Sequence, residues 1–505
     1  MDNTTERINR YFEDHKDGFF IDDITCNDLD LDRIFDAVNG TYSSLGEEIL
    51  YHMLRTPVFD RNALSELERH LEHYSVDSAQ KNKTIQSLKS ISKLKKISVF
   101  EYLGKLDEVK RIGELRLFIP MIMMLFGIVL SFFYSLPGIV VIVVSFVINT
   151  VRYFRLLKDI RPYLVCFAYV FRAIVSSKNI DGISEDEIKD LLPMTRRNFI
   201  LGNLSGVSAN GGTGNPFDLL LDLLRMSLHL DIIRFYHLTD RVKKNKDKIT
   251  DLLSHIGYID SYIAICGFRN GLQYYSKPEF VDEKLIKCVD MYHPLIDEPV
   301  PNTIDTHRGV LITGSNASGK STFLRTLAVN VLFAQTINTV LAREYYAPLS
   351  FLITSISLRD DLIGKDSFYM AEVKAVKRII QKASSDKDGF VICFVDELLK
   401  GTNTLERIAT SSKILSELSK DNILCFAATH DIELTRILGE LYDNYHFSED
   451  ITSDEDIRFS YKMMEGPSTT TNAIRLLVAL DFPYSIIDEA TDMVKRFNET
   501  GIWHL

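Results

Sequence analysis

The sequence contains few cysteines, and none of them lie close together along the chain. Its six cysteines include no Cys-x-x-Cys pair, which excludes zinc ribbons and thioredoxin-like redox sites and is typical of a reducing compartment. No apolar run follows the charged start, residues 1–7, so we expect no secretory signal. Acidic residues outnumber basic ones by 69 to 58, which argues against a surface that is basic throughout but allows a local basic groove.

Apolar residues, by contrast, are abundant, and they concentrate in one segment. The chain is 46% hydrophobic with a mean hydropathy of +0.00, and no residue between Arg116 and Arg152 is charged. A single membrane helix needs about 20 residues, so the break at Ser135–Gly138 predicts two spans, about 116–134 and 137–153. Basic residues flank both ends, which predicts cytoplasmic N- and C-terminal parts. A buried hairpin in a soluble core, or a re-entrant loop, is the alternative.

The rest of the chain divides into segments that differ in the spacing of their apolar residues. Helical spacing of apolar residues predicts a helical N-terminal and core segment over residues 1–115 and a helical return limb over residues 154–278. Residues 279–505 have short apolar runs alternating with helical patterns, which predicts an α/β domain. The expected fold class is therefore an α/β P-loop NTPase domain following an all-α core that a transmembrane hairpin, residues 116–153, interrupts.

The P-loop expectation rests on the segment GVLITGSNASGKST, residues 309–322. A β-branched strand leads into GxxxxGK[ST] and then into an apolar-periodic helix, which is the context that this motif requires. Backbone N–H groups of such a loop converge on phosphate oxygens, the lysine reaches the outer phosphates and the serine hydroxyl binds Mg²⁺. The sequence predicts an ATP site formed by Gly314, Ser315, Asn316, Ala317, Ser318, Gly319, Lys320, Ser321 and Thr322.

Two later strands end in candidate catalytic residues. The apolar run Val391–Val395 is followed by Asp396 and Glu397, at the strand end where parallel sheets bind ligands. We expect Asp396 to hold Mg²⁺ together with Ser321, and Glu397 to polarise the attacking water. The next apolar strand ends at His430, which could contact the γ-phosphate or be purely structural.

The order of these motifs resembles that of the MutS family of DNA mismatch-repair ATPases. The similar segments are Tyr292–Leu295 with TGSNASGKSTFLR, SLRDDLIGKDSFYMAEV (357–373), VDELLKGTNTLE, FAATHDIEL, GPSTTTNAIRLLVALDFPYSIIDEA (466–490), and the helical stretches 50–74 and 256–280. The resemblance implies ATP hydrolysis with Mg²⁺ in a homodimer whose ATPase domains share composite sites. It also implies that Ser367 of one subunit approaches the γ-phosphate bound by the other; the alternative is an ordinary helix N-cap.

The sequence also departs from the family pattern. Only a short stretch precedes the helical core, with no visible mismatch-reading domain, and the apolar hairpin stands where the family has its DNA clamp. Basic groups at 87–96 and 241–248 could contact DNA, anionic lipid or only water. We therefore expect a membrane-anchored, MutS-like ATPase with the lipid bilayer as a partner and DNA as a candidate partner. The alternatives are an ATP-driven membrane machine or a nucleotide switch, neither with a DNA role.

Overall fold

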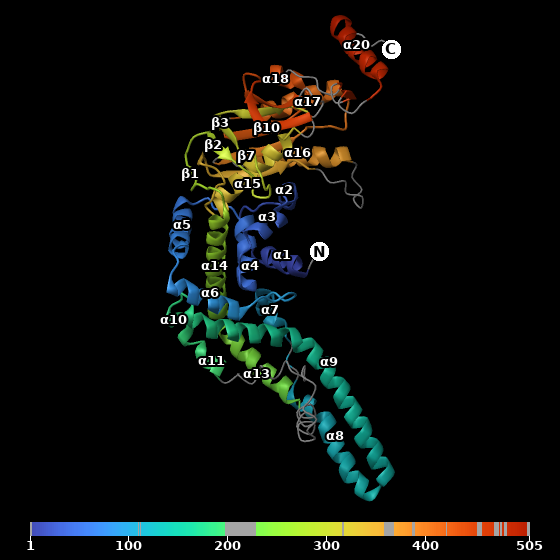
Figure 1. Cartoon of the computed structure of the whole chain (residues 1–505). Coiled ribbons are helices and arrows are strands. Elements are labelled where there is room, and N and C mark those ends of the chain that lie inside the picture. Colours follow the sequence, from blue (N-terminus) through green and yellow to red (C-terminus); the bar gives the residue numbers. More distant parts are fainter. Residues whose placement is uncertain are drawn as a thin grey trace. The chain divides into compact units, whose positions relative to one another are not determined.

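The chain forms two compact units, shown in Figure 1, a ribbon drawing of a computed structural model. The structure describes residues 3–109, 111, 113–196, 229–315, 318–357, 368–385, 389–420, 422–451, 457–468, 474, 477–478 and 482–501. Unit 1 comprises Met1–Lys16, Asn39–His52 and Leu71–Cys266, and unit 2 comprises Asp17–Val38, Met53–His70 and Gly267–Leu505. Each unit is thus assembled from three stretches of chain, and each is considered separately below.

The described part of unit 1 is helical. Its α-helices include α1 (Asn3–His15), α4 (Ser44–Arg55), α6 (Ala79–Ile91), α7 (Val99–Gly104), α8 (Glu114–Phe133), α9 (Ser135–Ser176), α10 (Glu185–Lys189), α11 (Leu192–Arg196), α13 (Leu230–Lys244) and α14 (Lys246–Gly271), with short 3₁₀ turns at Lys105–Glu108 and Ser177–Asn179. Helices α4 and α14 continue past the unit boundary into unit 2. Residues 203–215 (NLSGVSANGGTGN), in which glycine, serine and asparagine predict a loop, lie outside the described residues.

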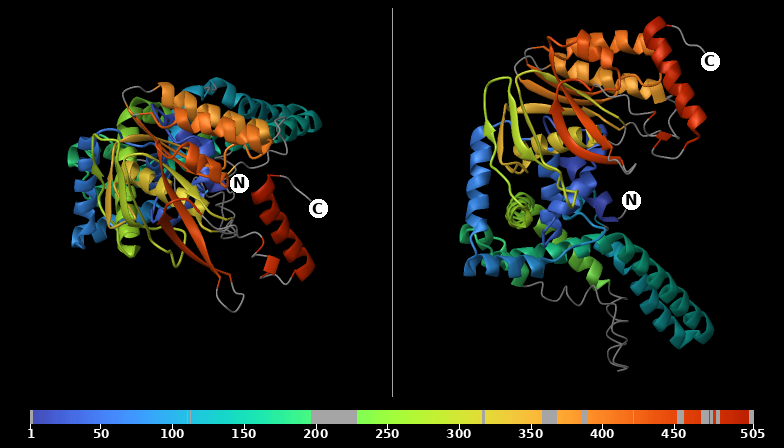
Figure 2. Two further views of the ribbon diagram at one scale, coloured as in Figure 1. Left: turned by 90° about the horizontal axis from the view of Figure 1, so that it is seen from above. Right: turned by 45° about the horizontal axis from the view of Figure 1, so that its top comes forward.

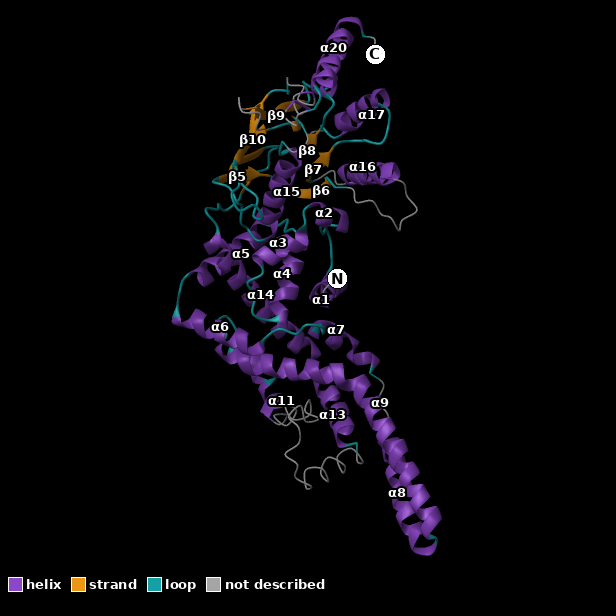
Figure 3. Ribbon diagram, turned by 45° about the vertical axis from the view of Figure 1, so that its right-hand side comes forward, coloured by secondary structure: helices purple, strands orange, loops and turns teal. Residues whose placement is uncertain are grey.

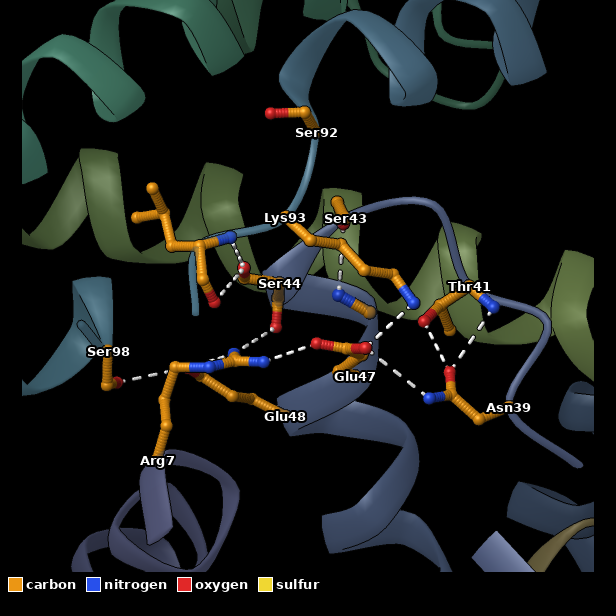
Figure 4. A network of polar contacts seen from close by, with 12 residues as sticks. Arg7, Asn39, Thr41, Ser43, Ser44, Glu47, Glu48, Ser92, Lys93 and Ser98 are labelled. Atoms are coloured by element: carbon orange, nitrogen blue, oxygen red, sulfur yellow. Dashed lines mark hydrogen bonds and ion pairs between the residues drawn. The ribbon is translucent and has the colours of Figure 1, made fainter. Parts of the chain in front are cut away.

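A buried ionic network joins α1, α4 and α7 inside unit 1 (Figure 4). The fully buried Arg7 guanidinium pairs with Glu47 and, at 2.7 Å, with Glu48. Ser98 donates to the other oxygen of Glu48 at 3.1 Å, and Lys93 pairs with Glu47 at 2.7 Å. Because each buried charge has an oppositely charged partner, the network ties the helices together without leaving a charge uncompensated.

Helices α8 and α9 form a hairpin, visible in Figures 1 and 3. The turn falls at Tyr134, one residue before the expected break, because Ser135–Gly138 already forms the first turn of α9, where proline is tolerated. A Cβ at Gly138 would lie 2.4 Å from the backbone of Ser131, so glycine permits the close approach of the two helices. The second leg does not end near residue 153 but continues to Ser176, with Pro162 inside the helix.

Most large side chains of the hairpin face outward. Twenty of its apolar side chains, from Ile119 to Phe154, are exposed, Phe132 and Phe133 by 83% and 77%. Within the part of the chain that the structure describes, one helix, Ser135–Asn179, is long and apolar enough to cross a membrane, and Leu117–Phe133 is a shorter apolar helix. An exposed apolar surface of this extent is not typical of a soluble domain.

The described part of unit 2 contains two sheets and several helices. One sheet has the order β1-β5-β2-β3 and the other the order β10-β9-β4-β8-β7-β6. The strands are β1 (Glu279–Phe280), β2 (Ile286–Met291), β3 (Asn302–Thr306), β4 (Gly309–Thr313), β5 (Glu344–Ala347), β6 (Ser350–Ser355), β7 (Phe390–Asp396), β8 (Ile423–Ala428), β9 (Tyr442–Ile451) and β10 (Ile457–Glu465). The helices are α2 (Asp23–Asp28), α3 (Leu31–Val38), α5 (Arg61–Ser75, which continues into unit 1), α15 (Lys320–Thr336), α16 (Phe368–Ser385), α17 (Thr404–Glu417), α18 (Ile432–Ile437) and α20 (Tyr484–Thr500).

The six-stranded sheet is parallel except at β10. Strands β9, β4, β8, β7 and β6 pair in parallel, whereas β10 pairs antiparallel with β9. Alternate side chains of β7 and β8 pack with α16, α17 and α18 in one apolar core, and the almost wholly buried α15 covers the other face (Figure 2). With helices on both faces, the carboxyl ends of the parallel strands are left as the edge where a ligand can bind.

Candidate functional site

The loop between β4 and α15 is shaped by two glycines. Gly314 and Gly319 have φ values of +145° and +113°, which side chains other than glycine rarely adopt. A Cβ at Gly314 would also lie 2.8 Å from the carbonyl oxygen of Phe447. Asn316 and Ala317 of the expected site lie outside the described residues. The described part of the loop therefore turns sharply at both ends and delivers the chain to the N-terminus of α15.

Lys320 and Ser321 begin α15 directly after this loop. The Lys320 ammonium donates to the carbonyl oxygens of Gly314 and Ser315, both at 2.7 Å, so it lies over the loop. Ser318 Oγ also donates to the Ser315 carbonyl, at 2.9 Å. A cation, a loop of this shape and the unpaired N–H groups of a helix start together favour an anion such as phosphate.

Asp396, the last residue of β7, lies next to Ser321 at the start of α15. Ser321 Oγ donates to Asp396 Oδ2 at 2.5 Å, although the two residues are 75 positions apart in the chain. The other carboxylate oxygen, Oδ1, is buried and has no hydrogen-bond partner among the described residues. Burial raises the pKa of Asp396, while the bond from Ser321 opposes that rise.

This pair of oxygen ligands fits a magnesium ion. Among the residues that the structure describes, no group of three or more His, Cys, Asp or Glu could hold a metal by itself. Mg²⁺, however, is commonly bound through one or two protein oxygens, with waters and substrate phosphates as the other ligands. The unpartnered Oδ1 of Asp396 beside the Ser321 hydroxyl is suited to that mode of binding.

Glu397 is held between His430 and Lys400. It has a left-handed backbone, with φ +56°; its Oε1 lies 2.9 Å from His430 Nε2 and its Oε2 lies 3.1 Å from Lys400 Nζ. Burial alone would raise the pKa of Glu397, but His430 and Lys400 outweigh it and lower the pKa to about 2. His430 is brought to the site by β8, because the Glu397 N–H binds the Ala428 carbonyl at 2.9 Å. The structure thus places Lys320, Ser321, Asp396, Glu397 and His430 along one edge of the sheet.

Two features of the site were missed in the sequence. A cavity of about 320 Å³ adjoins the loop at Gly319 and Thr322 and is lined by aromatic side chains that include Tyr292, Phe447 and Tyr461. These residues come from three separate segments, so no local pattern could predict the cavity. The second feature is Lys400, for which the sequence motifs predict no role. Ser367 lies outside the described residues, and α16 begins directly after it.

A parallel sheet with a glycine-bounded loop, a helix start and paired acids at its carboxyl edge is typical of nucleotide-binding α/β domains. Comparison with known proteins agrees with this class of protein and indicates one family within it. Residues 310–498 match the family model for MutS domain V. The match begins in β4 and ends in α20, so it includes Lys320, Ser321, Asp396, Glu397 and His430.

Similar curated proteins bear the same family name. The chain is 29% identical to the DNA mismatch repair protein MutS of Streptococcus uberis over 292 residues, which is 55% of this chain and 34% of the relative. It is 28% identical to the Thermus aquaticus protein of that name over 52% of this chain and 32% of the relative. The matches support membership of the MutS family, and they span about a third of the length of these relatives.

Proposed function

We propose that this protein is a membrane-anchored, MutS-like ATPase that binds and hydrolyses ATP at a composite site in a homodimer. The observation that carries the proposal is the set of contacts at the sheet edge, above all the bond between Ser321 and Asp396 beside a cation-flanked Glu397. The match to MutS domain V over these residues supports the same conclusion, since MutS proteins are ATPases.

Each side chain has a distinct role in this proposal. Lys320 exchanges its loop carbonyl partners for the outer phosphates of ATP, and the N-terminus of α15 stabilises their charge. Glu397 orients a water molecule in line with the γ-phosphate and accepts its proton. His430 holds one oxygen of Glu397 at 2.9 Å and so fixes the direction of the other. The aromatic cavity next to Gly319 has the size and character to accept the nucleotide base.

Mg²⁺ would be held by Ser321 and Asp396 and would neutralise charge on the β- and γ-phosphates. On the resemblance to MutS, the proposal includes Ser367 of one subunit as a group that would approach the γ-phosphate bound by the other. Closure of the ATPase dimer around ATP would then move the helical unit.

The membrane and DNA parts of the proposal rest on different observations. The outward-facing apolar hairpin α8–α9 supports insertion into a lipid bilayer, with both flanks in the cytoplasm. The names of the similar proteins support DNA as a partner. The second candidate function is an ATP-driven membrane machine or nucleotide switch without a DNA role, which the same hairpin favours.

ATP turnover by the purified full-length protein tests the central claim. Glu397→Gln keeps the shape of the side chain but removes the base, so we expect kcat to fall by about 10²- to 10⁴-fold while nucleotide binding is retained. Lys320→Ala should weaken binding and abolish turnover. Phosphate release and equilibrium binding of a fluorescent ATP analogue measure the two effects.

Lys413→Ala is the matched control, because Lys413 is an exposed lysine on α17. It should leave both measurements unchanged. A wild-type protein that binds ATP but does not turn it over would reject hydrolysis and leave the nucleotide switch. Equal turnover in wild type and Glu397→Gln would reject the assigned base.

A further inference from the structure

Glu372 is a buried carboxylate that the proposed mechanism does not use. It lies on α16 and is 3% exposed. Its Oε1 accepts a hydrogen bond of 3.1 Å from the backbone N–H of Lys400. Its Oε2 is buried with no hydrogen-bond partner in the described part of the chain. A carboxylate in such a place is costly unless it has a task, and the hydrogen bond from Lys400 connects it to the candidate active site.

The segment that Glu372 holds has an unusual backbone. Glu397 and Leu399 both have φ +56°, a left-handed conformation that side chains other than glycine adopt at a cost in free energy. Such a backbone persists only where surrounding contacts hold it. Burial raises the pKa of Glu372, and the N–H groups of Lys400, Leu399 and Gly401 oppose that rise; of these, the Lys400 N–H forms the hydrogen bond to Glu372 Oε1.

Lys400 connects Glu372 to Glu397. Its backbone N–H binds Glu372, while its ammonium lies 3.1 Å from Glu397 Oε2. His430 holds the other oxygen of Glu397 at 2.9 Å. If the Lys400 backbone moved, the ammonium would leave Glu397, and the carboxylate would be held from one side only.

We propose that Glu372 is a positioning residue that fixes the backbone of residues 397–401, and through Lys400 holds Glu397 in the orientation needed to direct the attacking water. The inference rests on the proposed function, because it assumes that Glu397 is the base. It adds a residue from α16 to a site otherwise formed by the loop before α15 and by the ends of β7 and β8. A carboxylate with a purely structural role would stabilise the fold without affecting Glu397 in particular.

Two variants of similar volume separate the hydrogen bond from packing. Glu372→Gln keeps a carbonyl oxygen that can accept from Lys400, whereas Glu372→Leu fills the space without an acceptor. We expect Glu372→Leu to lower kcat by at least about tenfold, with KM and nucleotide affinity changed by less than about twofold. Glu372→Gln should keep most of the activity. Lys377→Ala, at an exposed position of the same helix, is the control and should match wild type.

A double-mutant cycle tests whether Glu372 acts through Glu397. In the Glu397→Gln background, Glu372→Leu should cause little further loss of turnover, because residues that act as a unit are not additive. Full additivity of the two losses would overturn the inference, as would a normal kcat in Glu372→Leu.

Amide hydrogen exchange gives a readout that does not depend on turnover. Protection of residues 399–401 should fall in Glu372→Leu and stay near the wild-type level in Glu372→Gln. Unchanged protection in both would overturn the inference, even if kcat fell. An inactive wild type whose loop still loses protection in Glu372→Leu would instead reject the proposed hydrolysis and leave the contact between Glu372 and this loop intact.

Discussion

Glu68 shows how one side chain can hold several segments of unit 2 together. Its two carboxylate oxygens accept from the two terminal nitrogens of Arg269 at 2.9 and 2.7 Å, and Asn338 donates to it at 2.9 Å. Lys277 lies 3.0 Å away. Burial would raise the pKa of Glu68, but Arg269, Asn338 and Lys277 outweigh it and lower the pKa from 4.5 to about 2. Bidentate contacts of this kind are among the stronger ones in proteins.

The lowered pKa predicts how this contact depends on pH. A carboxylate whose pKa is lower in the folded state stabilises that state above its unfolded pKa, and the effect is lost as pH falls. Glu68 should therefore contribute fully above pH 4.5 and nothing below about pH 2. Glu68→Gln should destabilise unit 2 by up to about 3 kcal/mol near neutral pH, and the difference should shrink steadily on acidification.

Urea denaturation followed by circular dichroism, at a series of pH values, measures this difference. The control is Glu66→Gln, because Glu66 is on the same helix with a side chain 68% exposed, and exposed pairs contribute little. A constant difference between wild type and Glu68→Gln from pH 7 to pH 3 would contradict the prediction.

At the residue scale, local spacing was sufficient for part of the candidate site. Lys320 and Ser321 follow from a continuous motif, and Asp396 and Glu397 from their position after an apolar run. Glu372 could not be identified in this way, because its partner Lys400 is 28 positions away and contributes its backbone N–H. Because that partner is a distant backbone group, the local sequence does not distinguish Glu372 from any other glutamate on a helix.

At the scale of elements, α2 connects an N-terminal segment to the nucleotide site. Asp28 at its end is buried and accepts from Thr354 Oγ1 at 2.6 Å and from the N–H groups of Ile356 and Ser357 at 2.9 and 2.7 Å. Arg325 of α15 donates to the Asp28 carbonyl at 2.9 Å. Residues far apart in the sequence thus fix the end of edge strand β6 against the helix that begins at Lys320, and periodicity alone predicts the helix but not this contact.

The sequence predicted the helical hairpin α8–α9, but it did not predict where the second helix ends. The charge-free run indicated two helices and the spacing after residue 153 indicated further helix, but not that α9 runs unbroken from Ser135 to Ser176. Residues beyond the apolar part of α9, such as Ile160, Leu164 and Phe167, are buried within unit 1. Beyond the segment with exposed apolar side chains, α9 is therefore stabilised by its packing inside unit 1.

We expect this hairpin to anchor the protein in a membrane. Wild type should sediment with membranes and resist extraction by high salt and alkali. Val143 and Val147 are 54% and 53% exposed, and each arginine placed in the middle of a span costs about 2.5–3.5 kcal/mol. The double variant Val143→Arg, Val147→Arg should therefore shift to the soluble or aggregated fraction.

The matched control is Val76→Arg, since Val76 is 63% exposed and lies outside the hairpin. It should remain in the membrane fraction. Wild-type protein that stays in solution after aggregates are removed would contradict membrane anchoring and leave the apolar hairpin as a protein–protein contact.

At the scale of the whole molecule, the basic groups bear on the proposal that DNA is a partner of this protein. The family resemblance favours DNA, whereas the hairpin stands where that family has its DNA clamp. The two basic groups seen in the sequence are partly neutralised in unit 1: Lys93 pairs with Glu47 at 2.7 Å, and Lys243 lies 3.5 Å from Asp107. These pairs leave fewer cations to contact phosphates than the sequence alone suggested.

Binding of duplex, branched and mismatched DNA to the full-length protein in nanodiscs therefore tests the DNA part of the proposal. We expect binding at low salt with a shallow salt dependence, a log–log slope of about −2 to −4, because each phosphate contact contributes roughly −0.9. Lys243→Glu with Lys244→Glu should weaken binding to all three substrates alike, since contacts to phosphates carry no sequence information, whereas Lys413→Glu on α17 serves as the control. Absence of binding at low salt, in a preparation that still hydrolyses ATP, would remove DNA and leave the ATP-driven membrane machine, because the nucleotide site and the hairpin do not depend on a nucleic-acid partner.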